Sequence, residues 1–266
     1  MNSRAHGDRA NEQADERVDE RADERVDERA DERADEQATE TRAVAERYAR
    51  RDAADPRYSP LRPDVWQLLH ERQRVLAQML VRHGCADLAA LRLVEVGCGR
   101  GDNLLELLRL GFAPEHLSGI ELLDDRLRQA RRVLSPAVSL WPGDATVAAV
   151  APQSQQLVLQ STVFSSLLDD AFQQRLAQAM WRWLAPGGAV IWYDFTVDNP
   201  RNPDVRGVPL ARVRELFPQG RIDARRVTLA PPLARALCRV HPVLYTWANA
   251  LPLLRTHLLA WIGKPK

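Results

Sequence analysis

Between residues 91 and 195, short apolar runs alternate with segments whose apolar residues recur at helical spacing. The apolar runs have strand length and are LRLVEV (91–96), LSGIEL (117–122), VSLWPG (138–143), QLVLQS (156–161) and GAVIWYDF (188–195). The helical patterns lie at 102–110, 124–134 and 169–184. Strands that alternate with helices and are apolar on both faces form a parallel sheet covered on both sides. We therefore expect a doubly wound α/β fold.

The flanking segments add elements to this core. A helix is predicted over about residues 64–83, because apolar residues recur there at helical spacing and Gly84 stops the pattern. After the fifth strand, residues 210–217 have a helical pattern and residues 221–230 are predicted to form a strand. At 266 residues, the chain has room for one α/β domain and some appended sequence.

Residues 14–37 repeat a four-residue unit, in which Ala or Val is followed by Asp-Glu-Arg. A helix turns about 100° per residue, so each unit moves its apolar residue about 40° around the axis and no continuous apolar stripe forms. We expect residues 1–41 to be a disordered, low-complexity segment or a fraying solvated helix, with a tether or partner-binding arm as the alternative. The folded domain is expected over 42–266, divided into 42–90 before the sheet, 91–200 as its core and 201–266 after it.

The charges are unevenly distributed along the chain. Residues 1–40 hold 15 Asp or Glu and 7 Arg, a net charge of −8, and the whole chain carries +1, which leaves +9 for residues 41–266. Residues 201–266 supply that excess alone, with 12 Arg or Lys against 3 acidic residues. A basic surface suits an anionic substrate, a nucleic acid or an acidic membrane face, and it is equally compatible with an ordinary solvated face.

The cysteines and the hydropathy pattern indicate the compartment. The chain has three cysteines, Cys85, Cys98 and Cys238, without CxxC spacing or neighbouring histidines. An odd number of this kind favours free thiols in a reducing compartment, and the spacing argues against a bound metal. The first 40 residues have no apolar signal region, and no run of 18 apolar residues occurs. We therefore expect a cytoplasmic protein without a membrane span.

A glycine-rich turn joins the first strand to the next helix in VEVGCGRGDNL (94–104). Such a turn places free backbone N–H groups beside a ligand. The dinucleotide pattern GxGxxG needs glycine where the chain has Asp102, and the P-loop pattern fails because no Gly-Lys-Ser/Thr follows. On its own, the turn is compatible with a nucleotide site or with a tight connection that binds nothing.

Acidic residues follow at the ends of the next two strands. Glu121 ends the second strand, 24 residues beyond Gly97, where a carboxylate can accept both hydroxyls of a ribose. Asp144 follows the third strand, at a loop where a carboxylate can accept from an adenine amino group. Three such features at the carboxyl ends of successive strands predict a nucleoside site.

With these residues in view, the chain resembles class I S-adenosylmethionine-dependent methyltransferases. The resemblance rests on the order of VEVGCGRG, GIEL, GDA, LVLQSTVFSSL and LAPGGAVIWYDF, and it covers about residues 60–200. It implies a methyl-transferring enzyme with S-adenosylmethionine as cofactor. It also implies a seven-stranded, mostly parallel sheet with 256–264 as the last strand and 231–254 as a helical insertion before it.

The resemblance also implies roles for individual residues. The cofactor site would take Glu95, Gly97, Cys98, Gly99, Gly101 and Asn103 at the methionine end, Glu121 and Leu122 at the ribose, Asp144 and Ala145 at the adenine, and Gln160 and Ser161 beside the methyl group. The family usually has Asp where this chain has Glu95, a conservative departure that keeps a role beside the methionine amino group. The segment ERYARR resembles an N-terminal lid and would add Tyr48 and Arg51.

The acceptor side is less strongly marked. WYDFTVDNPRNPDVRGV and LPLLRTHLLAWIGKP resemble a bacterial subgroup linked to surface polysaccharide or secondary-metabolite clusters, which implies a saccharide, a lipid-linked glycan or a small metabolite as acceptor. The predicted substrate-binding residues are Phe164, Asn199, Arg201, Asn202 and Arg206. Amide and guanidinium donors on a proline-ordered loop can hold a polar substrate, and a turn-rich connector with solvated arginines is the alternative.

A hydroxyl acceptor is a poor nucleophile and benefits from a base within hydrogen-bond reach. Asp194 ends the fifth strand at the edge where doubly wound folds bind ligands, so it is the predicted base. The alternative is that Asp194 only orders the following loop.

The insertion at residues 231–254 is rich in aromatic and apolar residues and is flanked by basic ones. It can close the acceptor pocket, contact an anionic membrane surface through 231–262, or serve ordinary packing, and Pro242 and Pro252 should break it into short helices. Two other functions stay open from the sequence. One is a nucleic-acid methyltransferase, disfavoured because no Asn/Asp-Pro-Pro-Tyr motif follows the fourth strand, and the other is a non-catalytic S-adenosylmethionine-binding module.

Overall fold

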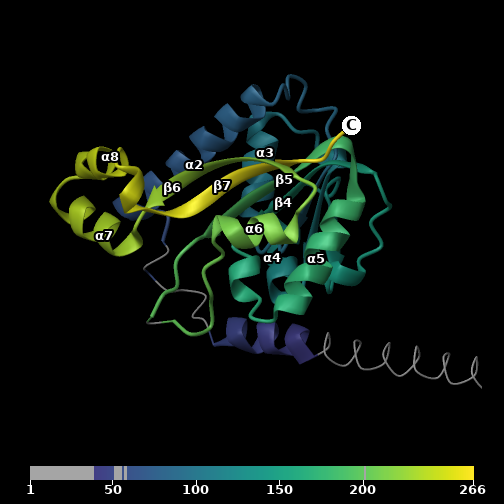
Figure 1. The fold of residues 1–266 in the computed structure, drawn as a ribbon, viewed down its shortest axis with the longest axis horizontal. Coiled ribbons are helices and arrows are strands. Elements are labelled where there is room, and N and C mark those ends of the chain that lie inside the picture. Colours follow the sequence, from purple (N-terminus) through teal and green to yellow (C-terminus); the bar gives the residue numbers. More distant parts are fainter. Residues whose placement is uncertain (1–38, 51–55, 57–58, 201) are drawn as a thin grey trace, which may run out of the picture. The chain divides into compact units, whose positions relative to one another are not determined.

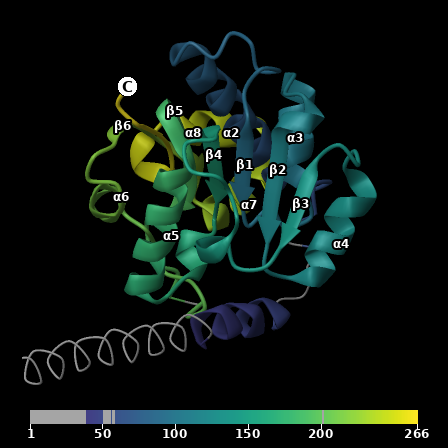
Figure 2. The same cartoon turned by 90° about the vertical axis from the view of Figure 1, so that its right-hand side faces the viewer.

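A computed structural model describes residues 39–50, 56, 59–200 and 202–266 of the chain. Residues 1–38, which hold the charged repeat, lie outside the described residues. Residues 44–266 form a compact unit around a seven-stranded sheet with the strand order β3-β2-β1-β4-β5-β7-β6, whose strands are labelled in Figures 1 and 2 together.

The strands follow the predicted alternation closely. They are β1 (Leu93–Val96), β2 (Leu117–Glu121), β3 (Ser139–Pro142), β4 (Gln155–Ser161), β5 (Leu184–Phe195), β6 (Arg221–Leu229) and β7 (Arg255–Gly263). The pairs among β1 to β5 are parallel, whereas β7 runs antiparallel to both β5 and β6. The expected doubly wound, mostly parallel fold is therefore confirmed.

Helices cover both faces of this sheet. They are α2 (Pro63–Arg82), α3 (Asp102–Leu110), α4 (Asp124–Val133), α5 (Asp170–Trp183), α6 (Leu210–Leu216), α7 (Pro231–Val240) and α8 (Val243–Asn249). Buried residues of α2, α3 and α4 pack on one face, and those of α5 and α6 on the other. Figure 2 shows α3 and α4 beside β1, β2 and β3.

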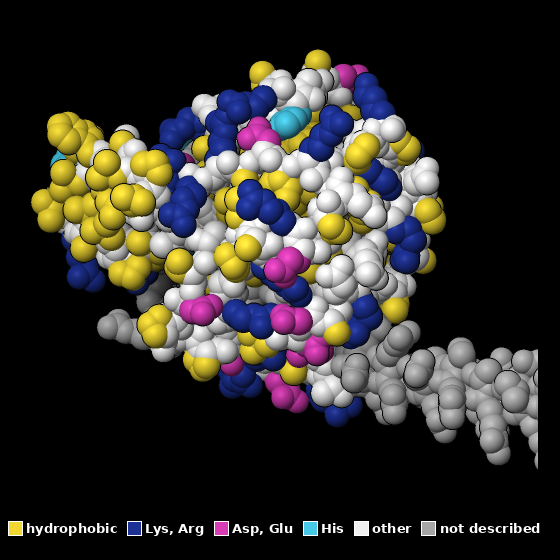
Figure 3. Space-filling model, viewed as in Figure 1, with side chains coloured by type: hydrophobic (Ala, Val, Ile, Leu, Met, Phe, Trp, Pro, Cys, Tyr) yellow, Lys and Arg dark blue, Asp and Glu magenta, His cyan; other side chains and the backbone are white. Residues whose placement is uncertain are grey.

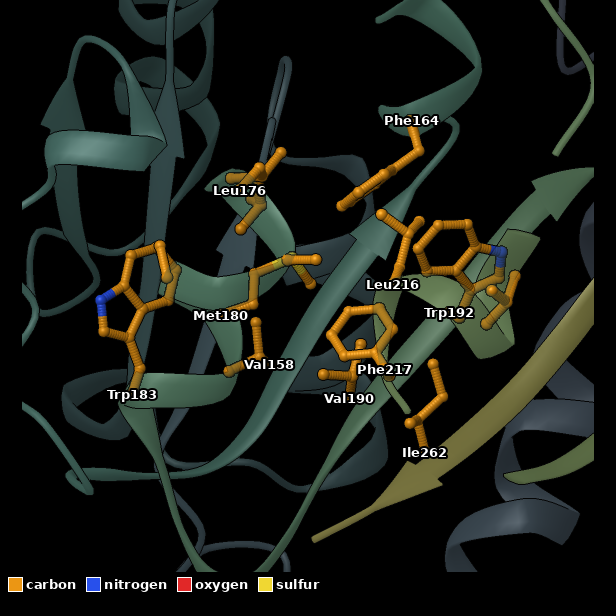
Figure 4. Packing of buried hydrophobic residues seen from close by; sticks show 14 of the residues in the cluster. Val158, Phe164, Leu176, Met180, Trp183, Val190, Trp192, Leu216, Phe217 and Ile262 are labelled. Atoms are coloured by element: carbon orange, nitrogen blue, oxygen red, sulfur yellow. The ribbon is translucent and has the colours of Figure 1, made fainter. Parts of the chain in front are cut away.

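The core beneath α5 shows why the strands are apolar on both faces. Met180 and Trp183 of α5 lie over Val158 of β4 and Val190 of β5, and all four side chains are buried (Figure 4). Burial of large apolar side chains is the main favourable contribution to folding, at about 1.5–3 kcal/mol each. This packing holds the carboxyl ends of the central strands in fixed positions.

The insertion between β6 and β7, residues 231–254, is called the lobe below. It contains α7 and α8, which Figure 1 places beside one end of β6 and β7, and the prolines separate its helices as expected. Its buried contacts centre on Leu229, Ala234, Cys238 and Tyr245.

A buried carboxylate of α2 ties the lobe to the sheet. Glu71 accepts hydrogen bonds from the Tyr245 hydroxyl at 2.7 Å and from the Thr228 backbone N–H, which lies 3.2 Å from each carboxylate oxygen. Thr228 has the left-handed φ of 64°, a strained conformation for a β-branched residue, and its hydroxyl lies 2.9 Å from that of Tyr193. These contacts fix the position of α8 relative to α2 and β5.

Candidate functional site

The glycine turn after β1 is built from backbone conformations that favour glycine. Gly97, Gly99 and Gly101 have φ values of 64°, 58° and 87°, in the left-handed region where side chains are strained. The Cys98 N–H donates to the Ile120 carbonyl at 3.0 Å, and the Gly101 N–H donates to the Cys98 carbonyl at 2.9 Å. The turn is thus tied to β2 and leads directly into α3.

Two alanine substitutions test how much the stability of the turn depends on close packing at Gly97. Both Gly97→Ala and Gly99→Ala place a side chain at left-handed φ, which costs about 1–2 kcal/mol. At Gly97 the new Cβ would also lie 2.6 Å from Val163 Cγ2, whereas at Gly99 no described atom lies within 4 Å. Urea unfolding should therefore show Gly97→Ala as less stable by about a further 1–3 kcal/mol. Equal losses of stability would contradict this account.

Glu121 holds the turn from the end of β2. Its Oε2 accepts from the Gly99 N–H at 2.7 Å and its Oε1 from the Leu123 N–H at 2.9 Å, and the side chain is buried. A carboxylate has about four acceptor positions, so each oxygen can accept one more hydrogen bond. The predicted contact with two ribose hydroxyls is compatible with these bonds.

Glu95 in β1 has an unsatisfied oxygen. Its side chain is fully buried, and Oε1 accepts from Asn103 Nδ2 at 2.5 Å, but Oε2 has no hydrogen-bond partner among the described residues. Burial raises the pKa of Glu95 to about 8, against the opposing effects of Asn103 and the Arg72 charge. A buried acceptor without a donor is costly, so Oε2 indicates a ligand that brings a donor, such as an ammonium group.

Arg72 of α2 was not predicted and lies in the middle of this cluster. Its Nη2 donates to Asn103 Oδ1 at 2.7 Å and to Glu106 Oε2 at 3.2 Å, and its Nη1 lies 3.4 Å from Ser161 Oγ. An arginine guanidinium can bind a carboxylate through two parallel hydrogen bonds, in bidentate geometry. The sequence contained a signal for it, because Arg72 falls at a core-facing position of the apolar stripe of its helix.

The remaining predicted residues of the cofactor site lie along the edge of the sheet where the parallel strands have their carboxyl ends. Asp144 Oδ1 accepts from the Thr146 N–H at 2.7 Å and begins a short 3₁₀ turn, and Ala145 packs against the core. Gln160 is buried, with Oε1 accepting from the Val163 N–H at 3.2 Å. Leu122 packs against the core, and burial raises the pKa of the Cys98 thiol, which lies under the turn.

The predicted lid segment contacts both sides of this edge. The Tyr48 hydroxyl lies 3.1 Å from Ser166 Oγ in the turn after β4, and the Arg126 guanidinium of α4 lies 4.4 Å from the centre of the Tyr48 ring. Arg47 Nη2 also donates to the Ser166 carbonyl at 3.0 Å. The helical residues 44–49 therefore connect the first turn of α4 with the turn after β4. Arg51 lies outside the described residues.

Asp194 lies at the carboxyl end of β5 and is fully buried. Its Oδ2 accepts from the Ser165 N–H at 3.1 Å and its Oδ1 from the Phe195 N–H at 3.0 Å, so the carboxylate does order the turn after β4. Burial nevertheless raises its pKa to about 7, in the range suited to a general base near neutral pH. Burial also lowers the pKa of His257, which stacks on Tyr193 with ring centres 5.1 Å apart, to about 4.

The predicted substrate-binding residues are held mainly by protein contacts. Phe164 is fully buried and packs against Trp192 with ring centres 4.6 Å apart, so its side chain belongs to the core (Figure 4). Arg206 forms an ion pair with Asp170 at the start of α5. Asn202 Oδ1 accepts from the Asp204 N–H at 3.1 Å, and the Asn202 N–H donates to the Asn199 carbonyl at 2.9 Å. Arg201 lies outside the described residues.

Within the described parts of the chain, no group of three or more His, Cys, Asp or Glu side chains is arranged to hold a metal ion. No helix among the described residues has the length and apolar character needed to cross a bilayer.

Comparisons with known proteins agree with the fold described above. Residues 93–188 match the protein family described as a methyltransferase domain, and no curated protein sequence matches the chain. The fold is similar to a putative sarcosine dimethylglycine methyltransferase from Galdieria sulphuraria (TM-score 0.57, 12% identity, 76% of this chain and 88% of that chain). It is also similar to a SAM-dependent methyltransferase from Archaeoglobus fulgidus (TM-score 0.53, 13% identity, 75% of this chain and 99% of that chain). A third similar structure is phosphoethanolamine N-methyltransferase 2 from Haemonchus contortus in complex with S-adenosyl-L-methionine (TM-score 0.53, 18% identity, 73% of this chain and 52% of that chain).

These features define a class I methyltransferase fold: the strand order of the sheet, the glycine turn after β1 and the family match. Within that fold, residues 93–188 form a methyltransferase domain.

Proposed function

We propose that the enzyme transfers the methyl group of S-adenosylmethionine to a hydroxyl acceptor on a saccharide, a lipid-linked glycan or a small metabolite. The observation that carries this proposal is the buried carboxylate of Asp194 at the carboxyl end of β5, with a pKa raised to about 7. A hydroxyl gains from such a base, because its proton must leave as the new bond forms. When bound, the cofactor supplies an electrophilic methyl group on a sulfonium.

The residues at the methionine end fit the two charges of an amino acid. Glu95 Oε2 would accept from the ammonium group, because it is a buried oxygen without a donor. Arg72 would bind the carboxylate, because its guanidinium lies beside Asn103 and Ser161 at the same end of the sheet. Asn103 joins the two through hydrogen bonds to both, so the pair is held in one orientation before ligand binding.

The nucleoside end would be held by acidic residues of the next two strands. Glu121 would accept from the ribose hydroxyls, and Asp144 would face the adenine amino group, with Leu122 and Ala145 supplying apolar contact. Tyr48 would help to cover the cofactor, since it contacts Arg126 at the start of α4 and Ser166 in the turn after β4. Asn199, Arg201, Asn202 and Arg206 are proposed as the polar border of the acceptor site.

The chemical class of the acceptor can be tested directly. The full-length enzyme, incubated with methyl-labelled cofactor and a fractionated extract of its source organism, should place label in the saccharide, lipid or small-molecule fraction. Mild base should leave the label attached, because an ether is stable where an ester is not. Label confined to RNA, or no transfer despite tight cofactor binding, would contradict the proposal and favour a nucleic-acid enzyme or a non-catalytic module respectively.

A further inference from the structure

Exposed apolar side chains gather on the lobe. The exposed fraction is 74% for Trp247 and 88% for Leu253, and Val240, Val243 and Leu251 of the same segment are also exposed. Figure 3 shows hydrophobic side chains covering much of the part of this face that α7 and α8 form. Side chains of this size are usually buried, and a contiguous exposed group of them marks an interaction surface.

The apolar surface continues from the lobe onto the start of α2. A hollow of about 360 Å³ lies between them, lined by Pro60, Leu61, Pro63, Trp66, Gln67 and Pro242. Leu61 and Trp66 are themselves exposed at its border. We call the lobe and this hollow together the apolar face.

The charge around the apolar face has one sign. The lobe contains no Asp or Glu, and its basic residues are Arg235 and Arg239. Arg255, directly after the lobe, donates to the Asn249 carbonyl at 2.8 Å. The nearby Asp64 at the start of α2 is buried and lies 3.0 Å from Arg62 Nη2, so it adds little negative charge at the surface. An aromatic and aliphatic surface with a basic border is the pattern of proteins that lie on anionic membranes.

We propose that the apolar face docks on the surface of an anionic lipid bilayer. Trp247, Leu251 and Leu253 would enter the boundary between headgroups and acyl chains, while Arg235 and Arg239 would contact the lipid phosphates. The acidic repeat at residues 14–37 is a poor occupant, because it offers only Ala and Val as apolar residues. A second copy of the chain is also disfavoured, since it would bring the same positive charge to the contact.

Docking of this kind would bring the proposed acceptor site, at the carboxyl end of β5, towards the membrane. The lobe is joined to α2 and β5 through Glu71, Tyr245 and Thr228, and β5 carries Asp194 at its end. A lipid-linked acceptor could then reach the site without leaving the bilayer. This extension rests on the proposed function, whereas docking itself does not.

Sedimentation with vesicles tests the proposal on the full-length chain. The enzyme should sediment with vesicles of phosphatidylcholine and phosphatidylglycerol, bind phosphatidylcholine vesicles far more weakly, and dissociate as salt is raised. Arg235→Gln and Arg239→Gln should each weaken binding about fivefold. Trp247→Ser should weaken it about tenfold or more, because a buried tryptophan returns to water.

Matched controls lie on the opposite edge of the sheet. Trp141→Ser in β3 and Arg131→Gln in α4 remove the same residue types far from the lobe and should leave vesicle binding unchanged. Binding of S-adenosylhomocysteine should be normal in every variant, which separates loss of docking from loss of the fold or of the cofactor site.

Three results would overturn the proposal. The first is failure to bind the anionic vesicles, and the second is binding that the lobe variants do not change. The third is a dimer in sedimentation velocity that Trp247→Ser abolishes, without vesicle binding, which would assign the apolar face to self-association.

Discussion

Asp194→Asn is expected to lower kcat by about 10²–10⁴-fold while the affinity for S-adenosylhomocysteine stays within about twofold. The asparagine has nearly the same shape and can still accept the Ser165 or Phe195 N–H through its oxygen, but it cannot take a proton. Steady-state kinetics on an identified acceptor and calorimetry with S-adenosylhomocysteine measure the two quantities.

The pH profile separates a base from a residue that only orders the loop. Because burial raises the pKa of Asp194 to about 7, kcat of the wild type should rise with pH through 7 and then level off. Asp194→Asn should remove this rise. Asp198→Asn is the matched control, since its Oδ1 accepts the Gly207 N–H at 2.8 Å in the same segment but the residue is exposed. A variant with normal kcat, or with low kcat and an unchanged profile, would rule out Asp194 as the base.

Glu95→Gln is expected to weaken binding of S-adenosylmethionine by about 10- to 100-fold at pH 7.5, because a charge-assisted hydrogen bond to its ammonium group is lost. Burial raises the pKa of Glu95 to about 8, so most of the free enzyme carries the neutral acid at pH 7. Binding an ammonium group requires the carboxylate. The affinity of the wild type should therefore increase up to about tenfold per pH unit below that pKa, and the affinity of the variant should be nearly constant.

Calorimetry at several pH values below 7.5 gives this comparison, in a range where an α-ammonium group keeps its proton. Glu106→Gln is the control, because Glu106 pairs with Arg72 at 3.2 Å but forms no hydrogen bond with Asn103 or Glu95 in the described structure. It should keep the pH dependence. Wild-type affinity that does not change with pH would contradict the assignment of Glu95 to the ammonium group.

The same two carboxyl groups should make the free enzyme less stable as pH rises. Both have a folded-state pKa above the ordinary value, 4.5 for Glu95 and 3.8 for Asp194. Their contribution to stability is therefore fully present below about pH 4 and is lost as the pH passes through about 7 and 8. Bound cofactor should offset the part due to Glu95.

The fold was predictable because each element carries its own pattern. Continuous apolar runs predict the central strands, and Gly84 ends α2 close to where the helix stops. Glu121 and Asp144 could be found because they follow strands whose carboxyl ends meet at one edge. These signals are local in the sequence, and the parallel sheet brings them together.

Glu71 could not be placed in the same way, and the only sequence signal for Arg72 is its position on the apolar stripe of α2. A helical arginine or glutamate usually faces solvent, and only the packing of α2 against β4, β5 and the lobe makes these two partly or fully buried. Phe164 is a predicted substrate-binding residue, and its buried contact with Trp192 depends on how the chain turns after β4. Long-range packing of this kind leaves little trace in a single sequence.

Two consecutive residues of α2 hold different parts of the enzyme. Glu71 binds Tyr245 at the base of the lobe, and Arg72 binds Asn103 beside the glycine turn. If docking of the lobe shifts α2, the two sites become coupled: the factor by which cofactor changes affinity for a surface then equals the factor by which that surface changes affinity for cofactor. The affinity of the enzyme for its methyl donor would then depend on whether the enzyme is at a membrane surface or free in bulk water.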